Sequence, residues 1–226
     1  MSTMSTGHAV DDFAPTAVYP SAAEAAATGP TEAVLRNVSW RTFMELTQDE
    51  TNASHRIWYD RGTLTVMPPS YLHERRISNL GRLVTEYCLL LDLACDVVGS
   101  MTWRREDLGR GFEGDDAFYL GDLAELPTTR ELDPATDPPP TLVIESEHSR
   151  SAIDKLDLLA ACGVPEVWRF NGKRLAVHRL DEGGDVEMDH SEALPEFPIA
   201  TAVDLIAGSA TTIQMIRRFR EAVQTT

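Results

Sequence analysis

Two stretches of the chain carry apolar residues at the spacing of an amphipathic helix. Within residues 71–93, apolar side chains recur every three or four positions, which is typical of a helix with one buried face. The positions that carry this pattern are Ile77, Leu80, Val84, Tyr87, Cys88 and Leu91. The same spacing predicts a terminal helix, from Ile213, Ile216, Phe219 and Val223.

Three shorter helices are predicted from caps and local patterns. Ser39 is a candidate cap for a helix that contains Trp40, Phe43, Met44 and Leu46. A helix over 151–162 is expected to turn Leu156, Leu159 and Ala160 inward and to end at Gly163. A capping-box-like pattern that starts at Thr201 predicts a further short helix.

Runs rich in β-branched and aromatic residues predict strands between these helices. Hairpins are expected over 56–66, with a turn at Asp60-Arg61-Gly62, and over 166–179, where Asn171-Gly172 favours a type I′ turn. Residues 96–105 and 115–120 each read as one strand, and Gly183-Gly184 precedes an edge strand. After a polar loop over 121–140, the run Leu-Val-Ile predicts a central strand over 141–147. The pattern therefore predicts an α/β fold, with a mixed sheet built largely from hairpins and flanked by helices.

The domain organisation follows from where large apolar residues begin. Residues 1–32 are dominated by Ala, Thr, Ser, Pro and Gly, so they bury too little surface to offset the entropy of ordering. We expect a disordered tail over 1–32 and a single domain over 33–226. Trp58, Trp103 and Trp168 lie in strand contexts and are expected in its core.

Composition limits the class of protein and of partner. The 226 residues carry 20 Lys and Arg against 36 Asp and Glu, a formal net charge of −16, so a polyanionic partner has to be met by a local basic patch. No apolar run approaches the roughly 18 residues that span a bilayer, and the first residues lack the features of a secretory signal. We therefore expect a cytoplasmic protein. The three cysteines show no Cys-x-x-Cys spacing and are expected to be small core residues.

Acidic residues gather at the predicted central strand. Because side chains alternate along a strand, Glu145 and Glu147 share one face with Val143. Asp115 heads its own predicted strand and comes beside them if the two strands are neighbours. An Asp and a Glu on adjacent strand ends are a typical protein contribution to a Mg²⁺ site, because Mg²⁺ takes its other ligands from water and substrate phosphate. Lys155, placed one turn into the next predicted helix, would complete a phosphodiester hydrolase.

At these residues the chain resembles the Uma-type family of the PD-(D/E)XK nuclease superfamily, over roughly residues 38–205. The resemblance is carried by VMPPS with His73-Glu74-Arg75, by GSMTWRREDLGRGFEGDDAFYLG, by PPTLVIESEHSRSAIDKLDLLAACGVPEVWRF and by the Asn-Gly hairpin. It implies a restriction-endonuclease-like α/β core, an enzyme that depends on Mg²⁺ or Mn²⁺, and a nucleic acid, with DNA as the expected form, as substrate.

Carried over residue by residue, the resemblance implies a catalytic set of Asp115, Glu145, Glu147 and Lys155. It implies metal ligands at Asp115, Glu145, Glu147 and Glu74, the last reaching the metal through water. Two positions depart from the family pattern. Gly114 stands where a proline is usual before the Asp, and Thr141 stands where an Asp is common.

Other interpretations of the same residues stay open. Asp115 can be a turn residue, Glu145 and Glu147 solvated positions on an edge strand, and Lys155 a surface lysine. His73 is expected to cap or hydrogen-bond near a helix start. The competing class of function is a nuclease-fold domain that has lost turnover and acts as a binding module. A homodimer is expected if both strands of a duplex are cut by two-fold related sites.

Overall fold

The computed structural model describes residues 16–18, 32–68, 70–146, 151–181, 183–208 and 210–225. Within these ranges the chain forms five α-helices and twelve strands, the strands arranged in two six-stranded sheets. The predicted α/β class with flanking helices is confirmed, and the arrangement is consistent with a restriction-endonuclease-like fold.

The first sheet, sheet A, is antiparallel throughout. Its strands in spatial order are β1 (Thr16–Val18), β2 (Ala33–Arg36), β4 (Thr63–Met67), β3 (Arg56–Asp60), β7 (Arg110–Glu113) and β6 (Thr102–Arg105). The predicted hairpin over 56–66 is β3 and β4. Arg61 and Gly62 both have positive φ in its two-residue turn, which suits the right-handed twist of the paired strands.

The second sheet, sheet B, is mixed, because β9 and β10 are parallel while its other pairs are antiparallel. Its strands in spatial order are β12 (Gly184–Met188), β11 (Leu175–Asp181), β10 (Glu166–Phe170), β9 (Leu142–Ser146), β8 (Asp116–Leu120) and β5 (Cys95–Val97). Strand β9 is central, as predicted, and joins β10 through a crossover that contains α4 (Lys155–Ala161).

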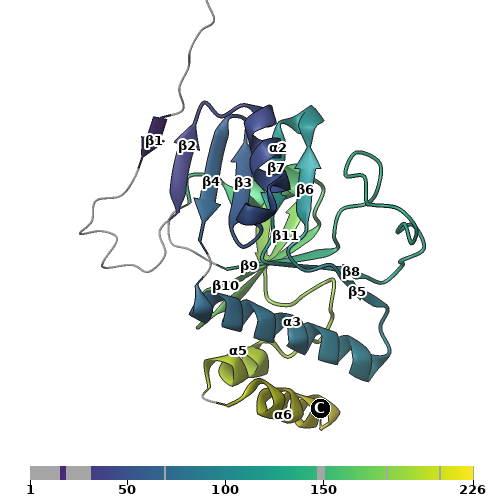
Figure 1. Cartoon of the computed structure of the whole chain (residues 1–226). Coiled ribbons are helices and arrows are strands. Elements are labelled where there is room, and N and C mark those ends of the chain that lie inside the picture. The colour runs from purple at the N-terminus through teal and green to yellow at the C-terminus, as the bar shows by residue number, and fades with distance from the viewer. Residues whose placement is uncertain are drawn as a thin grey trace, which may run out of the picture.

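Three apolar clusters give the order of the layers. The outer face of sheet A packs Ile57, Tyr59 and Leu64 against α2 (Trp40–Gln48). Its inner face packs Trp58 and Trp103 against β8, β9, β10 and α4. The far face of sheet B packs against α3 (Tyr71–Leu91), with α5 (Ile199–Ala207) and α6 (Thr212–Gln224) joining the same cluster. Figure 1 shows this stack, with α2 over sheet A and with α3, α5 and α6 below sheet B.

Helix α2 lies close to sheet A because β7 has a glycine beneath it. Ser39 caps α2 by accepting a hydrogen bond from the backbone of Thr42, as predicted. The ring of Phe43, which is fully buried, occupies the space that a Cβ on Gly111 would need. Any larger residue at position 111 would therefore displace α2 from the sheet.

The prediction of one strand over 96–105 is wrong. These residues form β5 in sheet B and β6 in sheet A, so the chain changes sheets between them. Gly99 has φ +63° at the change, and Met101 donates a backbone hydrogen bond to Gly99. Both halves are extended and partly apolar, so the periodicity carries no sign of the break.

Two local predictions around α4 and β10 also need correction. The Asn171-Gly172 turn is not type I′, because only Gly172 has positive φ; the side chain of Asn171 instead accepts from the backbone of Lys173 and Arg174. Helix α4 starts at Lys155 rather than 151, because Asp154 is its N-cap. As predicted, Leu159 is buried, and Leu156 and Ala160 are partly buried and pack against the same cluster; Leu158, which was not singled out, is also buried.

At the C-terminal helices, the predicted cap was misplaced. Helix α5 begins at Ile199 with no side-chain cap, and the capping box belongs to Thr211 and Gln214 at the start of α6. Helix α6 buries Met215 and Phe219, while Ile213 is 60% exposed rather than part of the buried face.

Core predictions for the large and small apolar residues are confirmed. Trp58, Trp103 and Trp168 are buried. Cys88 and Cys162 are buried and Cys95 is partly buried, and all three are free thiols.

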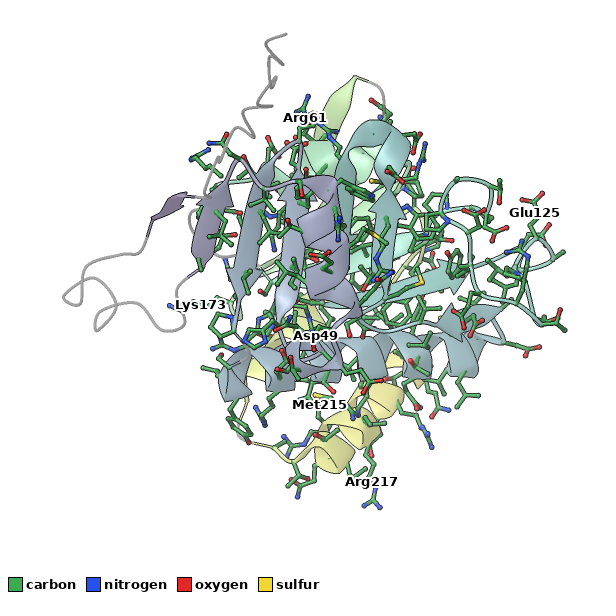
Figure 2. The ribbon with its side chains drawn as sticks, turned by 45° about the horizontal axis from the view of Figure 1, so that its top comes forward. Asp49, Arg61, Glu125, Lys173, Met215 and Arg217 are labelled. Atoms are coloured by element: carbon green, nitrogen blue, oxygen red, sulfur yellow. The ribbon has the colours of Figure 1, made fainter. Side chains whose placement is uncertain are left out.

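The predicted tail and loop account for much of the remaining chain. Most of residues 1–32 lies outside the described residues; within that range, Thr16–Val18 form β1, which pairs with β2. The loop between β8 and β9 extends away from both sheets, and Figure 2 shows Glu125 at its outer end. Within the described ranges, no helix is both long and apolar enough to cross a membrane. The cytoplasmic location stays a prediction.

Candidate active site

Two acidic side chains meet where the chain passes from sheet A to sheet B. Asp115 lies between β7 and β8, and β8 pairs with β9, which carries Glu145. The backbone N–H of Asp115 donates to Oε1 of Glu145 at 3.2 Å, and Oδ2 of Asp115 accepts from the backbone N–H of Ser146 at 2.8 Å. Asp115 is 9% exposed and Glu145 is 2% exposed. The structure thus places these two carboxylates in one buried cluster.

Side chains alternate between the two faces of sheet B, and this alternation decides which acidic residue faces the cluster. Val143 packs with α4 and the inner face of sheet A, while Leu142 and Ile144 pack on the α3 side. Glu145 therefore lies on the α4 side, as the period of two predicts. Asp116 pairs with Ile144 and lies against Gly81 of α3, on the opposite face from Glu145.

Lys155 approaches the same carboxylates from α4. Its Nζ donates to Oε2 of Glu145 at 2.8 Å and lies 4.2 Å from the centroid of the Trp58 ring. Lys155 is the first residue of α4, not one turn into the helix as predicted. The aromatic face and the carboxylate together hold the ammonium group in a site that is largely shielded from water.

Three further polar residues complete the cluster, from α3 and β3. Nε2 of His73 lies 3.2 Å from Oδ1 of Asp115 and 3.6 Å from Oε1 of Glu74. Nε of Arg56 lies 3.4 Å from Oδ1 of Asp115, and its Nη2 lies 3.5 Å from Oε2 of Glu74. Arg56 belongs to sheet A, so the site draws on both sheets and on α3 and α4.

These neighbouring groups give the two buried carboxyl groups, Asp115 and Glu145, different pKa values. Burial raises the pKa of Glu145 to about 7, although the charge of Lys155 opposes the shift. Burial would also raise the pKa of Asp115, but the hydrogen bond and charge of His73, with Lys155 and the Ser146 N–H, lower it to about 2. Burial lowers the pKa of His73, and the hydrogen bond and charge of Asp115 outweigh this effect and raise it. The pKa of Asp115 therefore lies well below that of Glu145.

The predicted site residues are distributed as follows. Asp115, Glu145 and Lys155 come together. Glu74 lies at the edge of the cluster, with its side chain 43% exposed and in contact with Arg56 and His73. Glu147 lies outside the described residues.

Sequence reasoning did not single out Arg56, and it expected His73 to cap or hydrogen-bond near a helix start. The backbone of His73 does donate to Ser70, the N-cap of α3, while its ring contacts Asp115. Between Arg56 and Asp115 the chain forms one helix, α3, and several strands, β4 to β7. No local sequence pattern could therefore link the two residues.

The two departures from the family pattern have visible local roles. A Cβ on Gly114 would lie 3.2 Å from Cγ1 of Val143 and 3.5 Å from Oε1 of Glu145. The glycine therefore permits the segment between β7 and β8 to lie close to β9. Thr141 links β8 to β9, because its Oγ1 accepts from the N–H of Leu120 at 3.1 Å.

Carboxylate oxygens are the ligands that Mg²⁺ prefers, and one or two carboxylates with water and phosphate make a common site. The donor chemistry of Asp115 and Glu145 fits such a cation. Among the described residues no group of three or more His, Cys, Asp and Glu is placed to hold a metal ion. Nε of Arg56 is buried without a hydrogen-bond partner in the described structure, beside Oδ1 of Asp115. Arg56 thus approaches Asp115 without a hydrogen bond from its Nε.

Comparison with protein-family models identifies the family of the chain. The model of the Uma2 family, described as "Putative restriction endonuclease", matches residues 40–213. This range contains every residue of the cluster. No curated protein matches the chain.

Proposed function

Because the chain belongs to the Uma2 family, we propose that it is a Mg²⁺- or Mn²⁺-dependent endonuclease that hydrolyses phosphodiester bonds in DNA. The family description supports a nuclease, and the carboxylate cluster supports the dependence on a divalent cation. The observation that carries the proposal is that Asp115, Glu145 and Lys155 come together in one cluster. They come from the segment between β7 and β8, from the central strand β9 and from the start of α4.

In the proposed mechanism, Asp115 and Glu145 would hold the cation, and Glu147 or Glu74 would contribute through water. A bound divalent cation would supply Lewis acidity toward a phosphate oxygen and lower the pKa of a water molecule. Lys155 keeps a positive charge within hydrogen-bond reach of Glu145, where it orients the attacking water or offsets charge that develops on the phosphate. His73 holds Asp115 through Oδ1 and thereby fixes the orientation of its carboxylate.

The buried environment supports this role for the chain's own groups. Water is largely excluded around Glu145, so a charge on Lys155 acts through a lower effective dielectric than at the surface. The ring of Trp58 restricts the lysine to the side of Glu145, which reduces the reorganisation needed during reaction.

One observation favours the competing class, a nuclease-fold domain that binds without turnover. Each carboxylate oxygen of Asp115 and Glu145 already lies near a donor: Ser146, His73 and Arg56 for Asp115, and the Asp115 backbone and Lys155 for Glu145. A cation would have to compete with these donors. The assay below separates the two classes.

The test is cleavage of supercoiled plasmid and of short oligonucleotides in Mg²⁺ or Mn²⁺. Asp115→Asn and Glu145→Gln keep the shape of each side chain, and Glu125→Gln makes the same kind of change on the distant loop. We expect cleavage by the parent and by Glu125→Gln and none by the two site variants. Calorimetric titration with Mn²⁺ should show binding that both site variants lose. Intact DNA binding with no cleavage by the parent protein would favour the binding module.

The proposal extends to assembly. Two copies related by a two-fold axis would present two such sites to the two strands of a duplex. Sedimentation of the protein with and without a duplex oligonucleotide tests this arrangement, and a monomer in both conditions contradicts it.

A further inference from the structure

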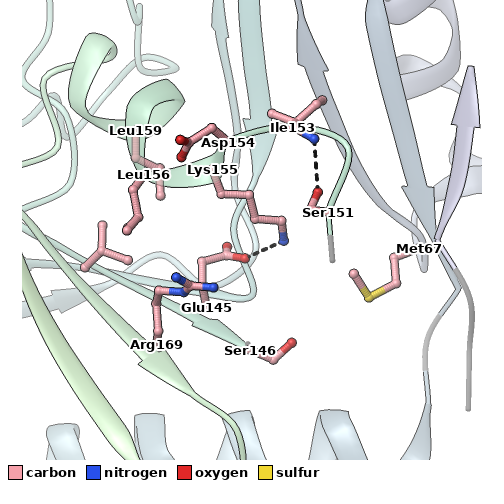
Figure 3. Close-up of a pocket in the computed structure, with 11 residues that line it drawn as sticks. Met67, Glu145, Ser146, Ser151, Ile153, Asp154, Lys155, Leu156, Leu159 and Arg169 are labelled. Atoms are coloured by element: carbon pink, nitrogen blue, oxygen red, sulfur yellow. Dashed lines mark hydrogen bonds and ion pairs between the residues drawn. The ribbon is translucent and has the colours of Figure 1, made fainter. Parts of the chain in front are cut away.

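The cavity beside Glu145 has no excess of positive charge with which to attract a polyanion. It measures about 370 Å³ and lies between the end of β4, α4 and β10. Among the described residues, its charged lining consists of Glu145 and Asp154 against Lys155 and Arg169. Figure 3 shows the ammonium group of Lys155 directed at Glu145, to which it donates at 2.8 Å. A nucleic acid therefore has to be attracted by charges outside this cavity.

Helices α3 and α6 carry an excess of positive charge, unlike the chain as a whole. The chain has a formal net charge of −16, whereas these two helices contain arginine and glutamate but neither lysine nor aspartate. Their charged residues are Arg75, Arg76, Arg82, Arg217, Arg218 and Arg220, against Glu74, Glu86 and Glu221. The helices lie side by side under sheet B (Figure 1), where Arg220 donates to Oε1 of Glu86 at 2.6 Å. They therefore form a basic surface of the kind that a polyanionic partner requires.

One stripe along α3 contains two of these arginines and faces away from sheet B. Its five positions are three or four residues apart, so they share one helix face, opposite to the buried Val84. We call this face the outer stripe; it consists of Tyr71, Arg75, Ser78, Arg82 and Thr85. Tyr71 is 83% exposed, Arg82 and Thr85 are exposed, and the other two side chains are partly exposed. Arginine, serine, threonine and tyrosine side chains are typical donors to the phosphates of nucleic acids.

The two arginines of the outer stripe keep their charge unpaired by a carboxylate. Nη2 of Arg75 donates to the carbonyl of Ala210 at 3.2 Å, and Nη1 of Arg82 donates to the carbonyl of Ser78 at 2.8 Å. Both of these acceptors are neutral. In the part of the chain that the structure describes, neither guanidinium group forms an ion pair. The positive charge of both groups is therefore open to an anionic partner.

Two acidic residues flank the outer stripe and do not cancel its charge. Glu74 lies 3.5 Å from Arg56 and 3.6 Å from the ring of His73, so its charge is already matched within the candidate site. Asp116 lies on the inner side of α3, where its Oδ2 occupies the space that a Cβ on Gly81 would need. The three arginines of α3 outnumber these two acids.

The outer stripe begins at the candidate active site and leads away from it. The ring of His73 lies 3.2 Å from Oδ1 of Asp115, and Arg75 follows two residues later on the same helix. At 1.5 Å per residue, Arg82 lies about 10 Å beyond Arg75 along the helix axis. One strand of duplex DNA carries a phosphate about every 3.4 Å along its axis, so this distance covers about three phosphates.

The geometry points to a backbone-binding track: we propose that the outer stripe of α3 binds the phosphates of duplex DNA, one at Arg75 and another at Arg82. Charge complementarity supports this partner, because the stripe is cationic in an otherwise acidic chain and starts beside the buried carboxylates. This inference rests on the proposed function, and it assigns α3 to substrate binding next to that site.

The experiment measures binding separately from cleavage. A 5′-fluorescein-labelled duplex oligonucleotide is titrated with the full chain in EDTA, and fluorescence anisotropy gives Kd at several KCl concentrations. Two duplexes of unrelated sequence are compared, and labelled oligo-glutamate serves as an acidic peptide probe. Arg75→Gln and Arg82→Gln each remove one charge, and Arg82→Lys keeps it. Arg41→Gln is the matched control, because the side chain of Arg41 is 87% exposed on α2, which covers the far face of sheet A.

For Arg75→Gln and for Arg82→Gln we expect the slope of log Kd against log salt to fall by about 0.9, the contribution of one phosphate contact. At about 0.1 M KCl, Kd should rise about five- to tenfold for each variant. Both duplexes should respond alike, because phosphate contacts carry no sequence information. Arg82→Lys should keep the parent slope, and Arg41→Gln should keep both the slope and Kd. The printed hydrogen bonds of Arg82 stay within α3, so Arg82→Gln should fold, and urea unfolding checks this.

The outcomes distinguish this proposal from the proposed function. If the parent cuts DNA and both glutamine variants bind the duplexes like the parent, the track is excluded and the nuclease stands. If the parent cuts nothing but its binding depends on both arginines as described, the track stands and the nuclease fails. If oligo-glutamate binds with this dependence and the duplexes do not, the surface belongs to an acidic protein partner and the proposal is overturned. Absence of duplex binding by the parent overturns it as well.

Discussion

Nζ of Lys155 donates to Oε2 of Glu145 at 2.8 Å and thereby ties the first residue of α4 to the central strand of sheet B. The chain has two lysines, and the other, Lys173, lies in the exposed turn between β10 and β11. A side-chain change at each position therefore compares a lysine inside the candidate site with one outside it.

Replacement of Lys155 should slow cleavage and weaken the fold. For Lys155→Met we expect the single-turnover rate of DNA cleavage to fall by about 10²–10³, as for loss of one preorganised electrostatic donor. The free energy of unfolding should fall by about 1–3 kcal/mol, because Glu145 loses a charged hydrogen-bond partner. Rapid-quench kinetics and urea unfolding measure the two effects. Lys173→Met should change neither the cleavage rate nor the free energy of unfolding. An equal effect of the two variants would contradict the placement of Lys155 in the site.

Arg110 links sheet A to helix α4 through an ion-pair chain. It is 7% exposed, and its guanidinium contacts Oδ1 of Asp60 at 3.0 Å and Oδ2 of Asp157 at 2.6 Å. For Arg110→Ala we expect a loss of about 1–3 kcal/mol in the free energy of unfolding, because Asp60 and Asp157 lose a buried partner.

Urea unfolding of Arg110→Ala is compared with that of Arg105→Ala. Arg105 pairs with Asp107, whose side chain is 57% exposed, so its loss should cost less than about 1 kcal/mol. Equal losses in the two variants would show that the position of Arg110 between sheet A and α4 carries no extra stability.

Stability should depend on the ionisation of Asp60. Burial would raise the pKa of Asp60, but hydrogen bonds and charges from Arg61 and Arg110 lower it below its ordinary value. The unfolded chain therefore binds this proton more readily than the folded chain. The contribution of Asp60 is present above its ordinary pKa of about 3.9 and is lost as the pH falls through the lower folded-state value.

The measurement is the difference in unfolding free energy between the parent and Asp60→Asn, across pH 6 to pH 3. We expect the difference to shrink below about pH 4. Asp189→Asn, at an exposed position after β12, serves as the control. A difference for Asp60→Asn that stays constant over this pH range contradicts the assignment.

Glu166 anchors the segment between β12 and α5. It is 3% exposed, and it accepts hydrogen bonds from the side chains of Trp168 and Ser191 and from the backbone of Glu192 and Ala193. Glu166→Ala leaves four donors without their acceptor, so we expect a loss of at least about 3 kcal/mol in the free energy of unfolding.

Thermal and urea unfolding of Glu166→Ala test this anchor. Glu187→Ala is the matched control, because Glu187 is on the surface and pairs with the exposed Arg174. Its expected loss is below about 1 kcal/mol. A small loss for Glu166→Ala would mean that this segment holds its place without the carboxylate.

Much of the fold follows from local patterns in the sequence. The period of two along β9 assigns Glu145 to the face of Val143, and the structure confirms this assignment. The pattern is reliable here because both faces of the strand are buried. The helical period of α3 identifies its buried side, except that Leu91 is 48% exposed. Patterns of this kind succeed where each face of an element packs against its own layer.

The remainder depends on contacts that sequence spacing does not encode. The exchange of sheets between β5 and β6 leaves both segments extended, and a positive φ at Gly99 is the local mark of the change. Likewise, Arg56 reaches Asp115 only because β7 delivers the chain from one sheet to the other. Asp115, Glu145 and Lys155 could be predicted from the sequence, but the contact of Arg56 with Asp115 could not.

The position of Asp115 at the passage between the sheets has a consequence for how the protein would lose function. Arg56 belongs to one sheet and Glu145 to the other, so a slight separation of the two layers pulls the cluster apart while every strand remains paired. Under mild urea or heat, cleavage should therefore decline before circular dichroism changes. Activity would then serve as a sensitive gauge of how firmly the two layers are docked.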